Sequence, residues 1–536
     1  MSRPAKQPNI VLILADDMGF SDLGCTGAEI RTPTLDRLAS GGALLSAMYN
    51  CARCCPTRAA LLTGLYPHKA GIGHMVMNFG TQAYQGFLRD DAATIAEVLK
   101  LGGYRTLMSG KWHVGGDLDA RLAERWRPGS PGHPMPLQRG FDRFFGTLDG
   151  ACSFFEPHYV MADDQRTTVE PGSFYMTDAI SDQAVAMIEE EPDAERPFFL
   201  YLAYTAPHWP LHAWPQDIAR YEGVYAGGWD AIRTARHEEM NGRSVLQNPW
   251  TISPRDAEAP PFADIPEKAW EAERMAVYAA QVDRMDQGIG RVVASLERQG
   301  ILDDTLILFL ADNGGCAEFM AEDGWAQWYP DALANGEPIV KGNLPSLRPG
   351  GAQTFMSYDL PWANVSNAPF RLYKHWVHEG GISTPLIAHW PARFAGPKIA
   401  HAPAHVVDLL PTLLEASGLS YPSELHERAL QPLDGESLLP LLSGRDWQRQ
   451  APLYWEHEGN AAIRQGRWKL VRRHGGPWEL YDMEADRTEL NDLAEGDRLR
   501  VEALSGEYRS WADSVGVLDW TRLQRGLGSA WGFGDD

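Results

Sequence analysis

Two apolar runs that lead into acidic residues constrain the fold of this chain most strongly. Asn9–Ala15 (NIVLILA) and Thr305–Leu310 are continuous in apolar residues, and each is followed within two positions by an aspartate. Runs this short and this apolar are typical of strands buried on both faces of a parallel sheet. Further apolar runs lie at Phe198–Tyr204 and Pro385–His389, and helical patterns lie at Asp91–Lys100 and Trp270–Gln299. The alternation predicts an α/β fold with a large mixed, mostly parallel sheet flanked by helices.

The pattern changes after about residue 445. Short strand-like segments separated by glycine-containing turns occupy Leu453–His457, Ala461–Arg464, Trp468–Arg472 and Trp478–Asp482. A charged helical stretch, Asp497–Val515, follows them. We therefore predict two domains, a large one over residues 1–444 and a small antiparallel sheet with a helix over residues 445–536. Gly223–Pro266 is rich in Pro, Gly, Asp and Trp without clean periodicity, which indicates a surface insertion.

Charge and composition exclude several classes of function. The 536 residues include 48 Lys+Arg and 71 Asp+Glu, a formal net charge of −23. Such a chain repels nucleic acid and anionic lipid, so we expect neither as a partner. The early apolar run Ile10–Ala15 is shorter than a signal-peptide core, and no apolar stretch is long enough to cross a bilayer. Six cysteines are too few for a disulfide framework, and we expect a reduced, cytoplasmic protein.

The acidic residues at the two strand ends indicate a metal site. Asp16 and Asp17 follow the first run, and Asp312 and Asn313 follow the second. Ligands of parallel sheets bind at the carboxyl ends of the strands, where these side chains are expected to meet. An oxygen-only ligand set suits Ca²⁺, Mg²⁺ or Mn²⁺. The alternative for the aspartate pair alone is a solvated loop or a helix cap.

A second motif surrounds Cys54, which begins the segment CCPTR. Pro56 fits the first turn of a helix, and Gly64 fits the position just after its end. The thiol of Cys54 would then lie at a helix N-terminus, where backbone N–H groups attract anions and lower a thiol pKa. Two alternatives stay open: a redox or metal site, because Cys51 and Cys54 form a CxxC, and an inert buried thiol.

The segment C-x-P-x-R with a downstream LTG resembles the signature of the cysteine-type sulfatases, which have an alkaline phosphatase-like fold. In that family a maturation enzyme converts this cysteine to formylglycine, an aldehyde whose hydrate is the nucleophile. Further family-like segments follow in order: NIVLILADDMGFSDLGC, GGYRTLMSGKWHVG, YTAPHWP, ADNGG, RLYKHWVHEGGISTP and the C-terminal IRQGRWKL and LYDMEADRTELNDL. Bacterial arylsulfatases are the members that the chain resembles most.

The resemblance implies a role for each matching residue. The divalent ion, foremost Ca²⁺, would be held by the modified Cys54 together with Asp16, Asp17, Asp312 and Asn313. Asp312 would also deprotonate the attacking hydroxyl. Arg58 and Lys111 would offset negative charge, His208 and Lys374 would donate to the leaving oxygen, and His113 would take the proton whose loss expels sulfate. Singly, each lysine has a surface alternative and each histidine a core alternative, and we leave His74, His212, His375 and His378 as structural residues.

The expected reaction is hydrolysis of a sulfate monoester, with an aryl sulfate as the expected substrate. One alternative is a phosphonate monoester or phosphodiester hydrolase with the same nucleophile, and another is a non-catalytic protein that binds sulfated glycans. Family members commonly show EGGIRVP where this chain has Ser383 in place of the arginine. Substrate selection is expected in the His74–Gly86 loop and the 223–266 insertion. The oligomeric state stays open.

Overall fold

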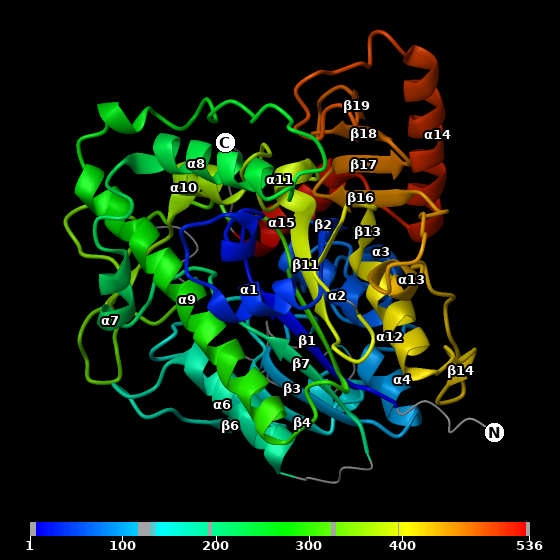
Figure 1. Cartoon of the computed structure of the whole chain (residues 1–536), viewed down its shortest axis with the longest axis horizontal. Helices are drawn as coiled ribbons and strands as arrows, with labels where there is room; N and C mark the ends of the chain where they lie inside the picture. The colour runs from blue at the N-terminus through cyan, green and yellow to red at the C-terminus, as the bar shows by residue number, and fades with distance from the viewer. Residues whose placement is uncertain are drawn as a thin grey trace.

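A single large sheet forms the body of the protein (Figure 1). The computed structural model describes residues 7–115, 129, 132, 134–190, 196–322, 329–394 and 396–531. The strand order is β12-β2-β11-β8-β1-β7-β3-β4-β5-β6, and β13 also pairs with β2. The strands are β1 (Asn9–Ala15), β2 (Ala43–Tyr49), β3 (Arg105–Lys111), β4 (Arg143–Thr147), β5 (Val160–Ala162), β6 (Gln165–Thr167), β7 (Phe198–Ala203), β8 (Thr305–Ala311), β11 (Ser383–His389), β12 (Lys398–Ala400) and β13 (Ala404–His405).

The central strands are parallel, and this confirms the predicted fold class. β8, β1, β7, β3 and β4 run parallel to one another, whereas β11 runs antiparallel to both β2 and β8, and β5 runs antiparallel to β4. Alternate side chains of β1 pack into two hydrophobic cores, one on each face of the sheet. Val11 and Ile13 pack with α6 (Met176–Glu189) and α9 (Lys268–Arg298), while Leu12 packs on the opposite face. The helices of that second face include α2 (Cys54–Thr63), α4 (Ile95–Leu101) and α12 (Leu409–Ser417).

Helix boundaries differ from the predicted ones where capping decides them. α4 begins at Ile95 rather than at residue 91, because the side chain of Thr94 accepts a hydrogen bond from the backbone of Glu97, and the Glu97 carboxylate accepts one from Thr94. This capping box satisfies the first free N–H groups of the helix. The cap at Thr94 therefore determines the start of the helix, four residues later than the apolar pattern indicates.

The C-terminal part forms a second, four-stranded antiparallel sheet. It consists of β16 (Leu453–His457), β17 (Asn460–Gln465), β18 (Trp468–Arg472) and β19 (Glu479–Asp482). One face is covered by α14 (Arg498–Val515), which contributes Leu504 and Tyr508. The other face packs on the main body, where Trp455 lies with Tyr49 and Ile382. Residues 532–536, the end of the predicted small domain, lie outside the described residues.

The 223–266 segment contains a helix that its composition did not indicate. This helix, α8 (Gly228–Gly242), turns Arg236 into the protein, where the guanidinium pairs with Asp22 at 2.6 Å. Both side chains are almost completely buried, with exposures of 1% and 0%. The segment therefore supports the loop that follows the first aspartate pair, in addition to contributing surface.

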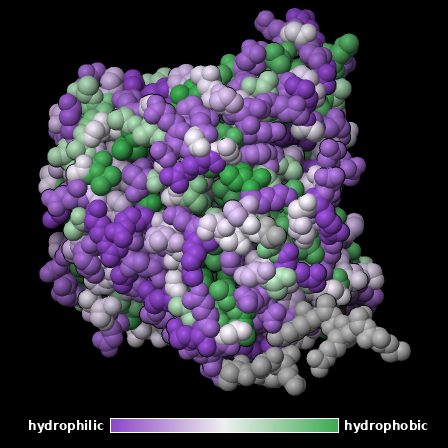
Figure 2. Space-filling view, in the orientation of Figure 1, coloured by the Kyte–Doolittle hydropathy of each residue, from purple (hydrophilic) through white to green (hydrophobic). Residues whose placement is uncertain are grey.

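The visible face of the protein is mostly hydrophilic. Figure 2 shows hydrophilic residues over most of the visible face, with hydrophobic residues in separate small groups. Within the described ranges, none of the helices combines the length and apolar character needed to span a membrane.

Candidate active site

The two strand ends that carry acidic residues meet as predicted. β1 and β8 are parallel neighbours in register, so Ala15 pairs with Ala311, and the residues that follow lie side by side. The backbone N–H of Asp17 donates to Oδ1 of Asp312 at 3.2 Å, and Nδ2 of Asn313 donates to Oδ1 of Asp17 at 2.7 Å. Every one of these side chains is buried.

These oxygens fit a divalent cation. Oδ1 of Asp16 and Oδ1 of Asn313 are buried without a hydrogen-bond partner, which is costly unless another group binds them. Burial, followed by the neighbouring Asp312 carboxylate, raises the pKa of Asp16 to about 7. A cation between the carboxylates would remove this repulsion, and oxygen ligands suit a hard ion such as Ca²⁺ or Mg²⁺.

Two buried cations approach the carboxylates from other elements. Arg58, in the second turn of α2, donates from Nε and Nη2 to Oδ2 of Asp312 at 3.1 and 2.8 Å. Lys111, the last residue of β3, lies with its Nζ 2.6 Å from Oδ2 of Asp16. Burial opposes the charge of Lys111, but Asp16 outweighs it and raises the lysine pKa. The cluster is therefore rich in both signs of charge, and the surface alternative for Lys111 is wrong.

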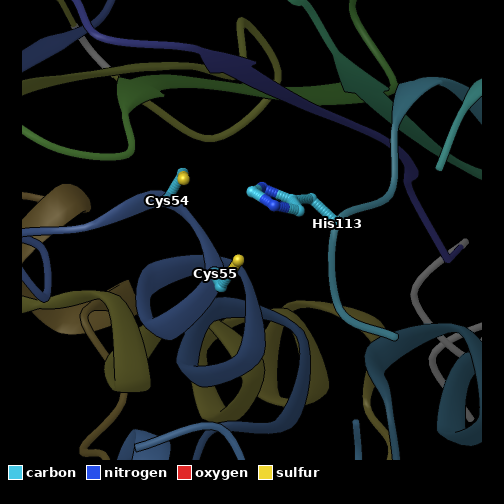
Figure 3. A group of neighbouring side chains, drawn as sticks. All are labelled: Cys54, Cys55 and His113. Carbon is cyan, nitrogen blue, oxygen red and sulfur yellow. The ribbon is translucent and has the colours of Figure 1, made fainter. Parts of the chain in front are cut away.

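Cys54 is the first residue of α2, as the Pro56–Gly64 spacing predicts, and Gly64 caps the helix in the left-handed conformation. Figure 3 shows the sulfur of Cys54 and the ring of His113 facing each other, with Cys55 beside them. A hydrogen bond with Cys55 is the largest effect on the thiol. It lowers the pKa of Cys54 well below its ordinary value, and Lys111 and His113 lower it further against the opposing effect of burial.

His113 lies two residues beyond the end of β3 with a positive φ of 51°, a conformation uncommon for a residue with a side chain. Burial lowers its pKa to about 3, so the imidazole is neutral near pH 7 and can accept a proton. All six cysteines are free thiols, and Cys51 contacts His405 rather than sharing the surroundings of Cys54. The thiols of Cys51 and Cys54 therefore lie in different surroundings, the first beside His405 and the second facing His113.

His208 and Lys374 form a pair on the other side of Asp17. Nζ of Lys374 lies 2.8 Å from Oδ2 of Asp17 and 3.3 Å from Nε2 of His208. Asp17 raises the pKa of Lys374 well above its ordinary value although burial opposes this, whereas burial lowers the pKa of His208. Lys374 is therefore the protonated member of the pair. All the site residues predicted from the sequence lie in this one region.

Arg53 and Glu318 are neighbours of the site that the sequence motifs did not indicate, and Trp209, expected to be a packing residue, contacts one of them. Nη1 of Arg53 lies 3.1 Å from Oε1 of Glu318, and the Glu318 carboxylate also accepts a hydrogen bond from Nε1 of Trp209 at 2.8 Å. Glu318 lies 3.7 Å from Nζ of Lys374. Arg53 could have been noticed because it is next to Cys54, and Trp209 because it is next to His208, whereas no pattern in the sequence points to Glu318.

The histidines left as structural residues divide into two groups. Nε2 of His212 lies 2.7 Å from the carbonyl of Thr354, which fits a core role. His378 lies beside Glu479. His74 and His375, in contrast, both contact Glu458 and belong to a cluster described below.

Comparison with known proteins agrees with this geometry. A family model described as sulfatase matches residues 8–419, and one described as N-sulphoglucosamine sulphohydrolase, C-terminal, matches residues 370–504. The chain is 32% identical to an uncharacterized sulfatase of Schizosaccharomyces pombe, over 91% of this chain and 90% of that protein. It is also 32% identical to an arylsulfatase of Klebsiella aerogenes, over 84% of this chain and 95% of that enzyme.

A solved structure, Ps i-CgsB in complex with k-i-k-neocarrahexaose, superimposes with a TM-score of 0.66 and 26% identity. The match covers 95% of this chain and 93% of that one. Family models, relatives and fold therefore agree over nearly the whole length. The chain belongs to the sulfatase family and is a sulfuric ester hydrolase.

Proposed function

We propose that this protein hydrolyses aryl sulfates with a formylglycine nucleophile made from Cys54 and a divalent cation, foremost Ca²⁺. The observation that carries the proposal is the position of Cys54 at the start of α2, facing His113 and within electrostatic reach of Lys111. The similarity to the Klebsiella arylsulfatase supports an aryl leaving group. The proposal requires a formylglycine-generating maturation enzyme as a partner.

The aldehyde hydrate would supply the attacking hydroxyl, and the cation would withdraw charge from it and from a sulfate oxygen. The candidate ligands are Asp16, Asp17, residue 54, Asp312 and Asn313. Asp312 is the base that accepts the hydroxyl proton. Burial raises the pKa of its carboxylate, and the negative charge of the Cys54 thiolate raises it further. Arg58 and Lys111, both fully buried, offset negative charge in the interior of the protein, where electrostatic interactions are strong.

The leaving group departs on the side of Lys374. The protonated Nζ of Lys374 donates to the ester oxygen as the S–O bond breaks. Nε2 of His208 lies 3.3 Å from this Nζ and can donate to the same oxygen. A general acid of this kind contributes on the order of 10²–10⁴-fold. Neutral His113 then removes a proton from the second hydroxyl of residue 54, so that sulfate leaves and the aldehyde returns.

Two measurements test the proposal. Peptide mass spectrometry of the residue 54 region, on protein made in its native host, is expected to show the aldehyde in place of the thiol. An unmodified thiol in active protein would contradict the mechanism, and in inactive protein it would favour a sulfated-glycan binding protein. The kcat/KM for 4-nitrophenyl sulfate is expected to exceed the values for the matched phosphate and phosphonate esters. A preference for either phosphorus ester would favour the phosphonate or phosphodiester hydrolase alternative.

A further inference from the structure

Three segments far apart in sequence bring histidines to a single carboxylate outside the site described above. Glu458 lies in the turn between β16 and β17, next to His457. His74 comes from the loop after α3 (Pro67–Ala70), and His375 follows Lys374 in the main body. The cluster therefore lies at the junction of the small sheet with the main body.

The ligand atoms lie close together. Nε2 of His74 is 2.7 Å from Oε1 of Glu458, and Nε2 of His457 is 3.6 Å from the same oxygen. One ligand atom from each of these three residues lies within 4.8 Å of the other two. Nδ1 of His375 lies 2.7 Å from the second oxygen, Oε2. The carboxylate is thus held on one side while its other oxygen faces two imidazoles.

The imidazoles have unused binding capacity. His457 is fully buried, at 0% exposure, and neither of its ring nitrogens has a hydrogen-bond partner. Nδ1 of His74 is buried without one as well. Buried polar atoms are normally hydrogen-bonded, so a histidine in this state needs a further group to bind it. The rings of His74 and His457 stack at 5.4 Å with an interplanar angle of 9°, so they approach the carboxylate together.

The backbone holds the two other members of the cluster in an uncommon conformation. Glu458 and Gly459 both have positive φ, 51° and 77°, as a two-residue type I′ hairpin turn requires. Asparagine or aspartate is the usual residue at the first of these positions, and glutamate is not. His375 has a φ of 93°. Conformations of this kind are energetically unfavourable and gather at functional sites.

We propose that His74, His457 and Glu458 form a second metal site, which takes Zn²⁺ or a similar transition-metal ion, with His375 as a positioning residue for the carboxylate. Two imidazoles and one carboxylate, with a fourth position open to water or a ligand, are a ligand set characteristic of zinc. Ca²⁺ and Mg²⁺ prefer oxygen ligands, so the ion would differ from the one at the Asp16–Asp312 site. This inference does not depend on the proposed function.

The second site lies close enough to the nucleophile region to act on it electrostatically. The Arg53 guanidinium pairs with Glu318 at 3.1 Å, and Glu458 is a second carboxylate whose charge acts on it. A metal ion on Glu458 would neutralise one of these two carboxylates. The guanidinium next to Cys54 would then be left with Glu318 as its main counter-ion.

Zinc titration of the full-length protein tests the proposal. Cys54, Cys55 and His113 form another group that zinc would bind, so the titration uses the Cys54→Ala variant in excess Ca²⁺ after treatment with a chelator. Calorimetry is expected to show one equivalent of bound Zn²⁺, and Co²⁺ in its place should give the visible absorption of a nitrogen- and oxygen-ligated ion. The readout requires no turnover, so its failure is distinguishable from failure of the proposed sulfatase mechanism.

Variants in the same background locate the ion. Glu458→Gln and His457→Ala are expected to weaken Zn²⁺ binding about 100-fold or more, and His375→Gln about 10–100-fold, as for other groups that orient a ligand. His237→Ala is the matched control, because His237 lies in α8 and bonds to Trp250. Circular dichroism checks folding, and the near-isosteric Glu458→Gln serves if His457→Ala does not fold. Absence of zinc binding, or binding unchanged in Glu458→Gln, overturns the proposal.

Discussion

Nη2 of Arg487 donates a hydrogen bond to Oγ of Ser383 at 3.1 Å, although the two residues are 104 positions apart. The same guanidinium donates from Nε to Oε2 of Glu379 at 2.8 Å and from Nη1 to the carbonyl of Ser46 at 2.7 Å. Lys469 holds the other oxygen of Glu379 at 2.8 Å. A guanidinium from the C-terminal part of the chain thus reaches Ser383 at the start of β11, and its contacts join the C-terminal part to the main sheet.

Replacing Arg487 with methionine is expected to destabilise the protein by about 3–5 kcal/mol, because the buried Glu379 carboxylate would lose a counter-ion. Chemical unfolding followed by tryptophan fluorescence measures the change. Ser383→Ala removes two hydrogen bonds, the one that Oγ accepts from Arg487 and the one that it donates to Glu379 at 2.9 Å, and is expected to cost about 2 kcal/mol. Equal effects of the two substitutions would mean that the ion network is unimportant for the junction of the sheets.

Cys54→Ala is expected to reduce kcat for 4-nitrophenyl sulfate by at least about 10⁴-fold, because it removes the nucleophile. The matched control is Cys51→Ala, whose thiol lies beside His405 and outside the cluster, at 3.7 Å from that ring. This control should keep most of its activity. Turnover that survives in Cys54→Ala would refute the mechanism.

Lys374→Met is expected to lower kcat by about 10²–10⁴-fold for phenyl sulfate and by less for 4-nitrophenyl sulfate. A lysine that protonates the leaving oxygen matters most when the leaving group is basic, and nitrophenolate needs little help. Rates across a series of substituted phenyl sulfates give the dependence on leaving-group pKa. A uniform loss across the series would instead assign Lys374 to binding of the sulfate group.

The sequence alone predicts a structural feature correctly where a single physical rule determines the position of the residues. Continuous apolar runs predicted β1 and β8, and the parallel register of these strands brings Asp16 and Asp312 together without further information. The start of α2 at Cys54 likewise follows from the placement of proline and glycine. These features depend on local composition and on a general property of parallel sheets.

Other features depend on partners distant in the sequence. The apolar run of β11 does not reveal that the strand is antiparallel to both neighbours. Arg236 is buried because Asp22 faces it, and nothing within the 223–266 segment indicates this pairing. Glu318 and Glu458 lie outside the motifs, and only the folded chain brings their charges close enough to act on Arg53. The roles of these buried charged side chains become clear only from the charged residues around them in the folded structure.

Removal of the divalent cation is expected to destabilise the protein more at pH 8 than at pH 6. In the cation-free protein, burial and then Asp312 raise the pKa of Asp16 to about 7, well above its ordinary value of 3.8. The folded state thus holds this proton more tightly than the unfolded chain, and the stability contributed by Asp16 falls as the pH rises from about 4 to 7. A bound cation compensates the ionised carboxylate, so its effect on the melting temperature is larger at high pH.

The same proton competes with the cation, so Ca²⁺ affinity is expected to fall about tenfold for each pH unit below about 7. Calorimetric titration between about pH 5.5 and 8.5 measures this slope. Asp16→Asn is the test variant, since its amide cannot hold the proton, and it should bind Ca²⁺ more weakly with a shallower slope. Lys100→Ala serves as the control, because Lys100 pairs with the partly exposed Asp142 and leaves the site unchanged. An affinity that does not vary with pH would show that Asp16 is ionised before the cation arrives, and that Lys111 and Arg58 alone suffice to hold its charge.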